Sequence, residues 1–179
     1  DTPLHYGSYG EALAIDADGN AYICWTDGYT GKSLAQKLSP DGERVWNSAS
    51  PVEIGPTTQM APAMTLNETD QPVFMIPEYQ GFTVYLYNTS GSKVWQKSYA
   101  NGYDGYTVQF VTLDSDAAGN LYLAWDDLRN GNWDILTNSL SPVGEFALPQ
   151  PTALVDPDLF TLQSGSVVSG TIDTLTGTI

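Results

Sequence analysis

The stretch that decides the fold is Ser115–Glu145, SDAAGNLYLAWDDLRNGNWDILTNSLSPVGE. It contains a turn (AAGN), an apolar run (LYLAW), an acidic turn (DDLRNGN), a second β-type run (WDILTNSL) and a final turn (SPVG). The pattern occurs twice more: DADGNAYICWTDGYTGKSLAQKLSPDGERVW begins at Asp16, and NETDQPVFMIPEYQGFTVYLYNTSGSKVW begins at Asn67. Self-similarity of this kind indicates a repeat architecture.

The repeat has a period of about 50 residues. Trp25 and Trp125 lie 100 positions apart, which is two periods, and the middle copy has Ile76 in the same slot. Further residues of the first copy recur 100 positions later, namely Gly19, Asn20, Tyr22 and Asp27. Matches at so many positions indicate three copies of one structural unit.

Each copy has room for four strands, because strands run about 5–6 residues and hairpin turns about 2–5. In the middle copy the sequence predicts strands at Ala61–Leu66, Val73–Glu78, Phe82–Tyr87 and Lys93–Tyr99. Gly10–Ile15 and Thr107–Leu113 are the matching first, innermost strands of the other copies. The turns between strands contain Gly, Asn and Asp, which suit the backbone angles of tight turns.

The second strand of each copy is apolar on both faces, as YICW, VFMI and LYLAW show. An antiparallel strand without a polar face must be covered from both sides. Four-stranded sheets stacked face to face around an axis provide that cover, and such a sheet is the blade of a β-propeller. The sequence therefore predicts an all-β chain with three four-stranded antiparallel blades of about 50 residues each.

The chain divides into a lead-in, three blades and a tail, at residues 1–9, 10–57, 58–104, 105–149 and 150–179. The tail is rich in Ser, Thr and Gly, which predicts the start of a second β unit, such as a β-sandwich or an assembly strand. Propellers typically have four to eight blades, so three blades leave two open faces. We expect more blades in the same polypeptide, a second copy or a neighbouring subunit to complete the ring.

Part of the third copy resembles a repeat common in secreted bacterial propeller proteins. AWDDLRNGNWDI at Ala124–Ile135, followed by a turn at Gly144, matches the core A-W-x-D-x-R-x-G-x-x-D-I…G of that repeat, which often continues to a Trp (…G…W). The first copy keeps the Trp, Asp and Gly but lacks the Arg and Asp-Ile, and the second keeps little beyond Gly91 and Trp95. The pattern is distantly similar to Asp-box (BNR) and PQQ-type propellers. The resemblance implies a propeller fold in a secreted protein, and it implies little about activity.

Composition narrows the function classes. The net charge of −15, with six Lys and Arg residues in total, argues against nucleic-acid binding, which needs a basic face. No apolar run approaches the roughly 20 residues that span a membrane. Cys24 lies inside an apolar run, so we predict a small buried hydrophobic residue. A start at Asp1 fits a mature, processed chain, and with the resemblance it predicts an extracellular or cell-surface location.

One turn is a candidate calcium site. Asp16, Asp18 and Asn20 place hard oxygen donors at alternate positions, as calcium loops do. The distal Glu of an EF-hand is absent, and Asp and Asn beside Gly are also common turn formers. Both interpretations stay open, and no other cofactor is expected.

A second set of candidates follows the second strands. Asp126, Asp127 and Glu78 stand there, and paired carboxylates can perform acid–base catalysis. The competing interpretation is a solvated turn or an ion pair with Arg129.

Aromatic residues in or beside turns are candidates for ligand binding, because an aromatic ring can stack on a sugar ring. These residues are Tyr79, Tyr103, Tyr106 and Trp133. Most other aromatic residues occupy repeat-equivalent slots and are expected to pack between blades. Asn67-Glu-Thr69 and Asn88-Thr-Ser90 match the acceptor pattern for N-glycosylation at Asn67 and Asn88.

The three copies share no clustered catalytic groups, so the sequence favours a non-enzymatic extracellular module with a structural or interaction role. One alternative is a carbohydrate-binding, lectin-like propeller. A second is a propeller enzyme of the glycoside hydrolase type, which would use the carboxylates after the second strands. The expected partners are copies of this chain or neighbouring subunits, together with a glycan, and not nucleic acid.

Overall fold

The computed structural model describes residues 8–58, 60–100, 108–129, 131–147 and 152–153. All regular elements in these ranges are strands, and they form three four-stranded antiparallel sheets. The first sheet contains β1 (Ser8–Ile15), β2 (Ala21–Asp27), β3 (Lys32–Leu38) and β4 (Val52–Thr57). The second contains β5 (Ala63–Leu66), β6 (Pro72–Glu78), β7 (Gly81–Tyr87) and β8 (Lys93–Ala100). The third contains β9 (Val111–Ser115), β10 (Leu121–Asp127), β11 (Asp134–Leu140) and β12 (Thr152–Ala153).

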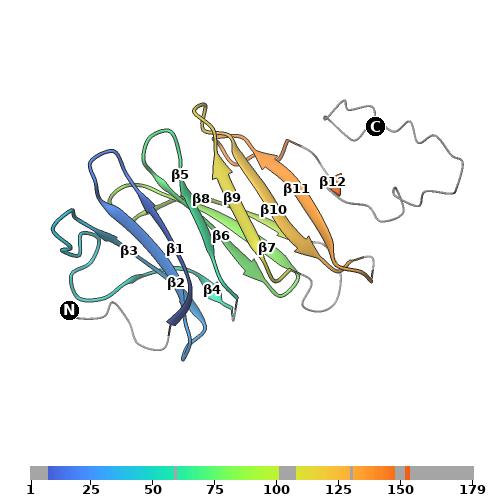
Figure 1. Cartoon of the computed structure of the whole chain (residues 1–179), viewed down its shortest axis with the longest axis horizontal. Coiled ribbons are helices and arrows are strands. Elements are labelled where there is room, and N and C mark those ends of the chain that lie inside the picture. The colour runs from blue at the N-terminus through green and yellow to red at the C-terminus, as the bar shows by residue number, and fades with distance from the viewer. Residues whose placement is uncertain (1–7, 59, 101–107, 130, 148–151, 154–179) are drawn as a thin grey trace, which may run out of the picture.

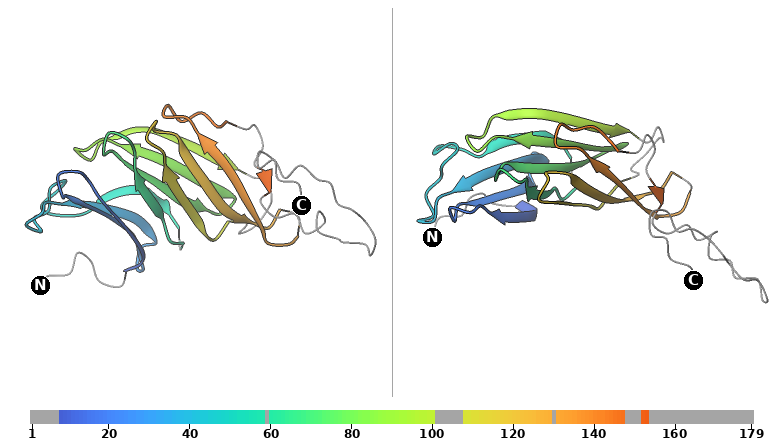
Figure 2. Two further views of the ribbon diagram at one scale, coloured as in Figure 1. Left: turned by 45° about the horizontal axis from the view of Figure 1, so that its top comes forward. Right: turned by 90° about the horizontal axis from the view of Figure 1, so that it is seen from above.

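The sheets follow one another in chain order, with the second between the first and the third (Figures 1 and 2). Their first strands are neighbours, because β1 contacts β5 and β5 contacts β9. Each sheet then runs outward as a meander in which every strand pairs with the next. The predicted all-β chain of three four-stranded antiparallel sheets is therefore confirmed.

Two stretches of the third sheet differ from the sequence prediction. β9 begins at Val111 and not at residue 107, because the Asp126 carboxylate accepts hydrogen bonds from the amides of Gln109 and Phe110 and holds that backbone outside the regular ladder. The fourth strand, Thr152–Ala153, pairs with β11 and lies beyond residue 149, where the prediction ended the third blade. The rest of the predicted tail, 150–151 and 154–179, lies outside the described residues, as does most of the lead-in.

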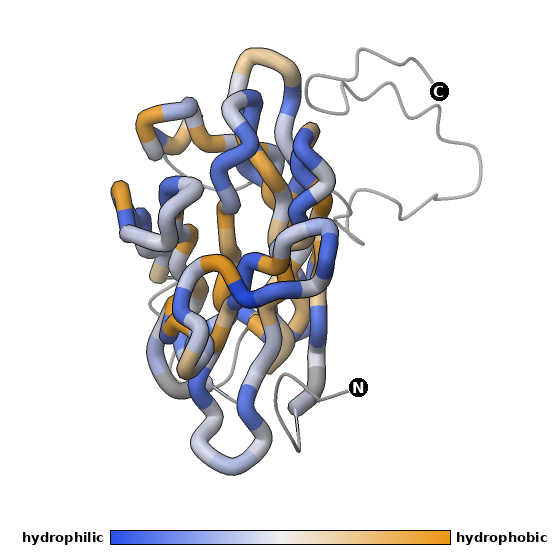
Figure 3. Tube along the Cα trace, turned by 90° about the vertical axis from the view of Figure 1, so that its left-hand side faces the viewer, coloured by the Kyte–Doolittle hydropathy of each residue, from blue (hydrophilic) through white to orange (hydrophobic). Residues whose placement is uncertain are grey.

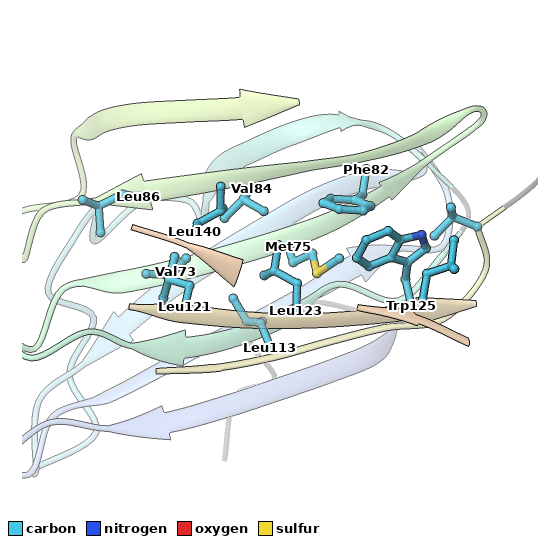
Figure 4. Packing of buried hydrophobic residues seen from close by; sticks show 12 residues of the cluster. Val73, Met75, Phe82, Val84, Leu86, Leu113, Leu121, Leu123, Trp125 and Leu140 are labelled. Atoms are coloured by element: carbon cyan, nitrogen blue, oxygen red, sulfur yellow. The ribbon is translucent and has the colours of Figure 1, made fainter. Parts of the chain in front are cut away.

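Alternate residues of each second strand face opposite neighbours. In β6, Val73 and Met75 pack toward the third sheet, whereas Phe74 and Ile76 pack toward the first. Both faces of this strand are buried, which is why its sequence is apolar without alternation. Figure 4 shows the larger cluster, in which Trp125 of β10 lies against the second sheet.

The three residues in the predicted Trp slot are all buried: Trp25, Ile76 and Trp125 are each at most 3% exposed. Cys24 is buried as well, and burial raises the pKa of its thiol to about 12. The thiol is therefore protonated and packed at neutral pH, as expected for a small hydrophobic residue.

Candidate functional site

The strands end in two groups of turns that differ in chemistry. At one end, four turns share one construction, in which a side-chain oxygen accepts hydrogen bonds from the backbone amides two and four residues later. The residues that supply this oxygen are Asp16, Asn67, Asn88 and Asp116. We call this the Asx-turn end, because such side-chain contacts close an Asx turn.

Asp16, the first residue of the candidate calcium site, has its oxygens occupied by N–H donors. They accept hydrogen bonds from the amides of Asp18 and Asn20 and from Asn20 Nδ2, and Lys37 Nζ lies 3.1 Å from Oδ2. Burial alone would raise the pKa of this carboxyl, but the Asn20 and Lys37 contacts hold it below its ordinary value. No group of three or more potential metal-ligating side chains occurs within the described ranges. The geometry favours the turn-forming interpretation of these residues.

We expect EGTA to leave the melting temperature unchanged, because a calcium ion would have to displace Lys37 and several N–H donors from Asp16. Differential scanning calorimetry with and without the chelator measures this directly, and Asp18→Ala is the matched variant. A melting temperature that EGTA lowers in the parent chain and not in Asp18→Ala would instead assign calcium to this turn.

Asn67 and Asn88, the candidate glycosylation residues, perform the same turn-closing role. Asn67 Oδ1 accepts hydrogen bonds from Thr69 N and Oγ1, and Asn88 Oδ1 accepts them from Ser90 N and Oγ. The Ser or Thr two positions on is therefore part of the turn, which gives the Asn-x-Ser/Thr pattern a structural origin. Modification at these residues stays a prediction.

The opposite end of the strands carries exposed aromatic residues in three equivalent turns, and we call it the aromatic end. The turns join β2 to β3, β6 to β7 and β10 to β11 (Figure 1). They present Tyr29, Tyr79 and Trp133, which are 81%, 49% and 48% exposed. Two of these were candidates from sequence, whereas Tyr103 and Tyr106 lie outside the described residues. Tyr29 was missed, although its place in the turn after a second strand was a usable signal.

The first and third aromatic turns are held by the carboxylate that ends each second strand. Asp27 accepts hydrogen bonds from Tyr29 N (2.9 Å) and Thr30 Oγ1 (2.6 Å). Asp127 accepts them from Arg129 N (2.8 Å), Nε (3.0 Å) and Nη2 (2.6 Å). The carboxylate at the end of the second strand therefore anchors the first residues of both turns.

The second aromatic turn is restricted by its short length and by the close packing of Gly81 against Tyr99. Tyr79 and Gln80 connect Glu78 to Gly81, which pair directly across the hairpin. Gly81 has φ of +156°, and a Cβ at this position would overlap the carbonyl oxygen of Tyr99. Glycine is therefore required for this tight connection.

The candidate catalytic carboxylates do not face a common space. Asp126 and Asp127 are consecutive in β10, so their side chains point to opposite faces of the third sheet. Asp126 Oδ1 accepts hydrogen bonds from two backbone amides at 2.7 and 2.8 Å. Glu78 shares the face of Ile76, which packs toward the first sheet, whereas Asp127 lies with Trp125 toward the second.

Asp127 lies at the centre of a buried cluster. Its ion pair with Arg129 at 2.6 Å confirms the alternative interpretation of this acidic turn, and Trp125 Nε1 donates to it at 3.3 Å. Arg129 Nη2 also donates to the Tyr99 hydroxyl, and its guanidinium carbon lies 5.6 Å from the centre of the Tyr99 ring. Burial would raise the pKa of Asp127, but the Arg129 and Trp125 contacts keep it below its ordinary value. The carboxylate is therefore charged and structural.

Comparison with known proteins gives a fold and no family. No protein-family model and no curated protein matches the sequence. Among solved structures, the chain is similar to an α-L-arabinofuranosidase from Clostridium thermocellum, with a TM-score of 0.55 and 14% identity over 84% of this chain and 52% of that one. A fucose lectin from Kordia zhangzhouensis in complex with methyl-fucoside has a TM-score of 0.46 and 13% identity over 82% and 100% of the two chains, a similarity too low to support an argument.

The chain spans about half the length of the arabinofuranosidase. That likeness and the three successive four-stranded sheets give the chain a β-propeller-like fold. Within the part of the chain that the structure describes, no helix is long and apolar enough to cross a membrane.

Proposed function

We propose that the chain is a non-enzymatic binding module of a secreted or cell-surface protein, of the kind that its repeat resembles. The observation that carries this proposal is the presence of an exposed aromatic residue, Tyr29, Tyr79 or Trp133, in the turn between the second and third strands of each of three successive sheets. Aromatic side chains present a large contact area with few rotatable bonds, so they dominate many binding surfaces. Three such turns lie at the same end of successive sheets and together offer a row of aromatic contacts.

Neutral carbohydrate is the ligand class that this row fits best. The C–H bonds on one face of a sugar ring pack against the negative face of an aromatic ring, and several such rings at one end can contact several sugar units. A chain with a net charge of −15 repels anions, which disfavours acidic glycans. The alternative ligand is a protein partner that inserts apolar side chains between the aromatic turns.

A glycoside hydrolase role has weaker support. Hydrolysis of a glycosidic bond requires two carboxyl groups about 5–10 Å apart on either side of that bond. Asp126 and Asp127 point to opposite faces and hold backbone amides or Arg129. The geometry therefore favours binding without turnover.

The test is a glycan array probed with the parent chain and with Tyr79→Ala and Trp133→Ala. We expect binding to a neutral glycan, and each variant should weaken it about tenfold or more, as for an aromatic contact residue. Val143→Ala is the matched control, because Val143 is exposed at the Asx-turn end and should bind normally. Equal binding by the parent chain and both aromatic variants would contradict the proposal, and so would the absence of binding to every neutral glycan.

A further inference from the structure

Arg129, at the aromatic end, is held by contacts that fix the plane of its guanidinium group. Its Nε and Nη2 atoms donate to Asp127 at 3.0 and 2.6 Å, and Nη2 also donates to the Tyr99 hydroxyl. The side chain of Arg129 is nevertheless 22% exposed, whereas that of Asp127 is fully buried. Arg129 therefore presents part of a fixed cation to solvent at this end of the strands.

The remaining nitrogen of this guanidinium group, Nη1, carries two N–H donors. Among the residues that the structure describes, none accepts a hydrogen bond from it. Because the guanidinium group is planar and rigid, the contacts of Nε and Nη2 also set the orientation of Nη1. Arg129 therefore offers preorganised donors, and a few such polar groups are what fix the orientation of a ligand in a binding site.

Arg129 is connected to two of the three aromatic turns. It lies in the turn between β10 and β11, which also presents Trp133. Its contact with Tyr99 reaches the second sheet, where the Tyr99 carbonyl packs against Gly81. Gly81 is the residue that closes the turn of Tyr79. Arg129 therefore lies at the junction of the second and third sheets, and each of these sheets carries an aromatic turn beside it.

The turn position of Arg129 is one that the first sheet uses to expose an aromatic residue. Tyr29 and Arg129 are equivalent, because the backbone amide of each donates to the carboxylate that ends its second strand, at 2.9 and 2.8 Å. The turn of Tyr29 is the lowest loop in Figure 3, and its colours show no strongly hydrophobic residue. An aromatic ring among polar groups suits a ligand that has both hydroxyl groups and apolar ring faces.

We propose that Arg129 is the polar anchor of the carbohydrate site, and that its Nη1 donates a hydrogen bond to a hydroxyl oxygen of a neutral sugar unit packed on Tyr79 or Trp133. This inference rests on the proposed function and names the residue that orients its ligand. The Asp127 carboxylate, 2.6 Å away, already compensates the charge of Arg129. An acidic sugar would gain little from a compensated cation, and the net charge of −15 repels it.

The test is nuclear magnetic resonance of the full 179-residue chain, labelled with nitrogen-15. The neutral probes are cellohexaose, xylohexaose and mannohexaose, and the acidic probe is hexagalacturonate. The arginines of the sequence are Arg44 and Arg129, so the variant Arg44→Lys assigns the guanidinium signals. We expect a neutral hexaose to shift the guanidinium signals of Arg129 and to leave those of Arg44 unchanged. The acidic probe should bind more weakly than the neutral one.

Isothermal titration calorimetry with the same probes supplies a second readout. Arg129→Lys keeps a positive charge opposite Asp127 but removes the fixed Nη1 donors. Its affinity for the bound hexaose should fall about tenfold or more, as for the loss of a hydrogen bond to a charged group. Arg44→Lys is the matched control, because Arg44 pairs with Leu38 at the Asx-turn end, and it should bind as tightly as the parent chain.

Unchanged Arg129 signals in a chain that binds a neutral hexaose would overturn the inference, whatever the affinity of Arg129→Lys, because Arg129 would then act only through the fold of its turn. The proposed function would still stand in that case if Tyr79→Ala or Trp133→Ala weakened binding. Tighter binding of hexagalacturonate, or no binding of any of the three neutral hexaoses, would also overturn the inference, whereas the proposed function is decided by the glycan array. The signals of the parent chain do not require any variant to fold.

Discussion

Replacing Trp125 with alanine is expected to lower the free energy of unfolding by about 3–5 kcal/mol, the usual cost of a large-to-small change in a core. Trp125 is buried between the second and third sheets. The centre of its ring lies 4.8 Å from that of Phe82 and 5.2 Å from that of Tyr99. The variant leaves a cavity between two sheets and removes the Nε1 donor from Asp127. Urea denaturation followed by circular dichroism measures the loss.

Trp133→Ala is the matched control for that experiment. Trp133 is the same residue type in the next turn and is half exposed, so its removal should change stability by about 0.5 kcal/mol or less. Equal stabilities of Trp125→Ala and the parent chain would contradict the packing of the second and third sheets described above.

The second large effect is expected for Asp127→Ala, at about 3–5 kcal/mol, because it removes one partner of a buried ion pair. The carboxylate is fully buried and receives three hydrogen bonds from Arg129 and one from Trp125. Without the carboxylate, the Arg129 guanidinium keeps its hydrogen bond to Tyr99 but loses its ion pair with Asp127. Asp41→Ala, which alters an exposed aspartate in another turn, serves as the control and should be nearly neutral.

Acid should reveal the same interaction. The pKa of Asp127 is lower in the folded chain than its ordinary value, so its contribution to stability is complete above the unfolded pKa and disappears as pH falls through the folded one. The pKa of Asp16 is lowered as well, and the two effects add. The parent chain should lose stability below about pH 4, and Asp127→Asn should lose less over that range. If the parent chain and Asp127→Asn lost the same free energy of unfolding as pH falls, Asp127 would not be the source of the acid sensitivity.

Much of the architecture follows from the sequence because the second strands have no polar face. VFMI in the middle copy requires cover on both sides, and the structure places one neighbouring sheet on each side of β6. The predicted strand Lys93–Tyr99 and the observed β8, Lys93–Ala100, agree to within one residue, since the glycine turn before it sets the start.

The roles of individual polar residues were harder to predict. The sequence made Asp16 a candidate calcium ligand and Asn67 a candidate glycosylation residue, but the turn-closing hydrogen bonds of both depend on which backbone amides lie within reach after folding. The start of β9 depends in the same way on Asp126, which is distant in sequence from the amides it holds. Tyr29 is exposed because the turn between β2 and β3 lies at the end of the sheet, a position that its neighbouring residues in the sequence do not reveal.

Trp46 packs on Gly91, and Trp95 packs on Gly144. Each of the first two sheets therefore contacts the next one through a tryptophan. Stability in such a linear array comes largely from nearest-neighbour contacts, so the end sheets have fewer of them than the middle one. Local opening should therefore start in the first and third sheets and reach β5–β8 last. The backbone amides of the middle sheet should therefore exchange most slowly with solvent. A mutation at Gly91 should weaken the contact between the first and second sheets more than it weakens either sheet by itself.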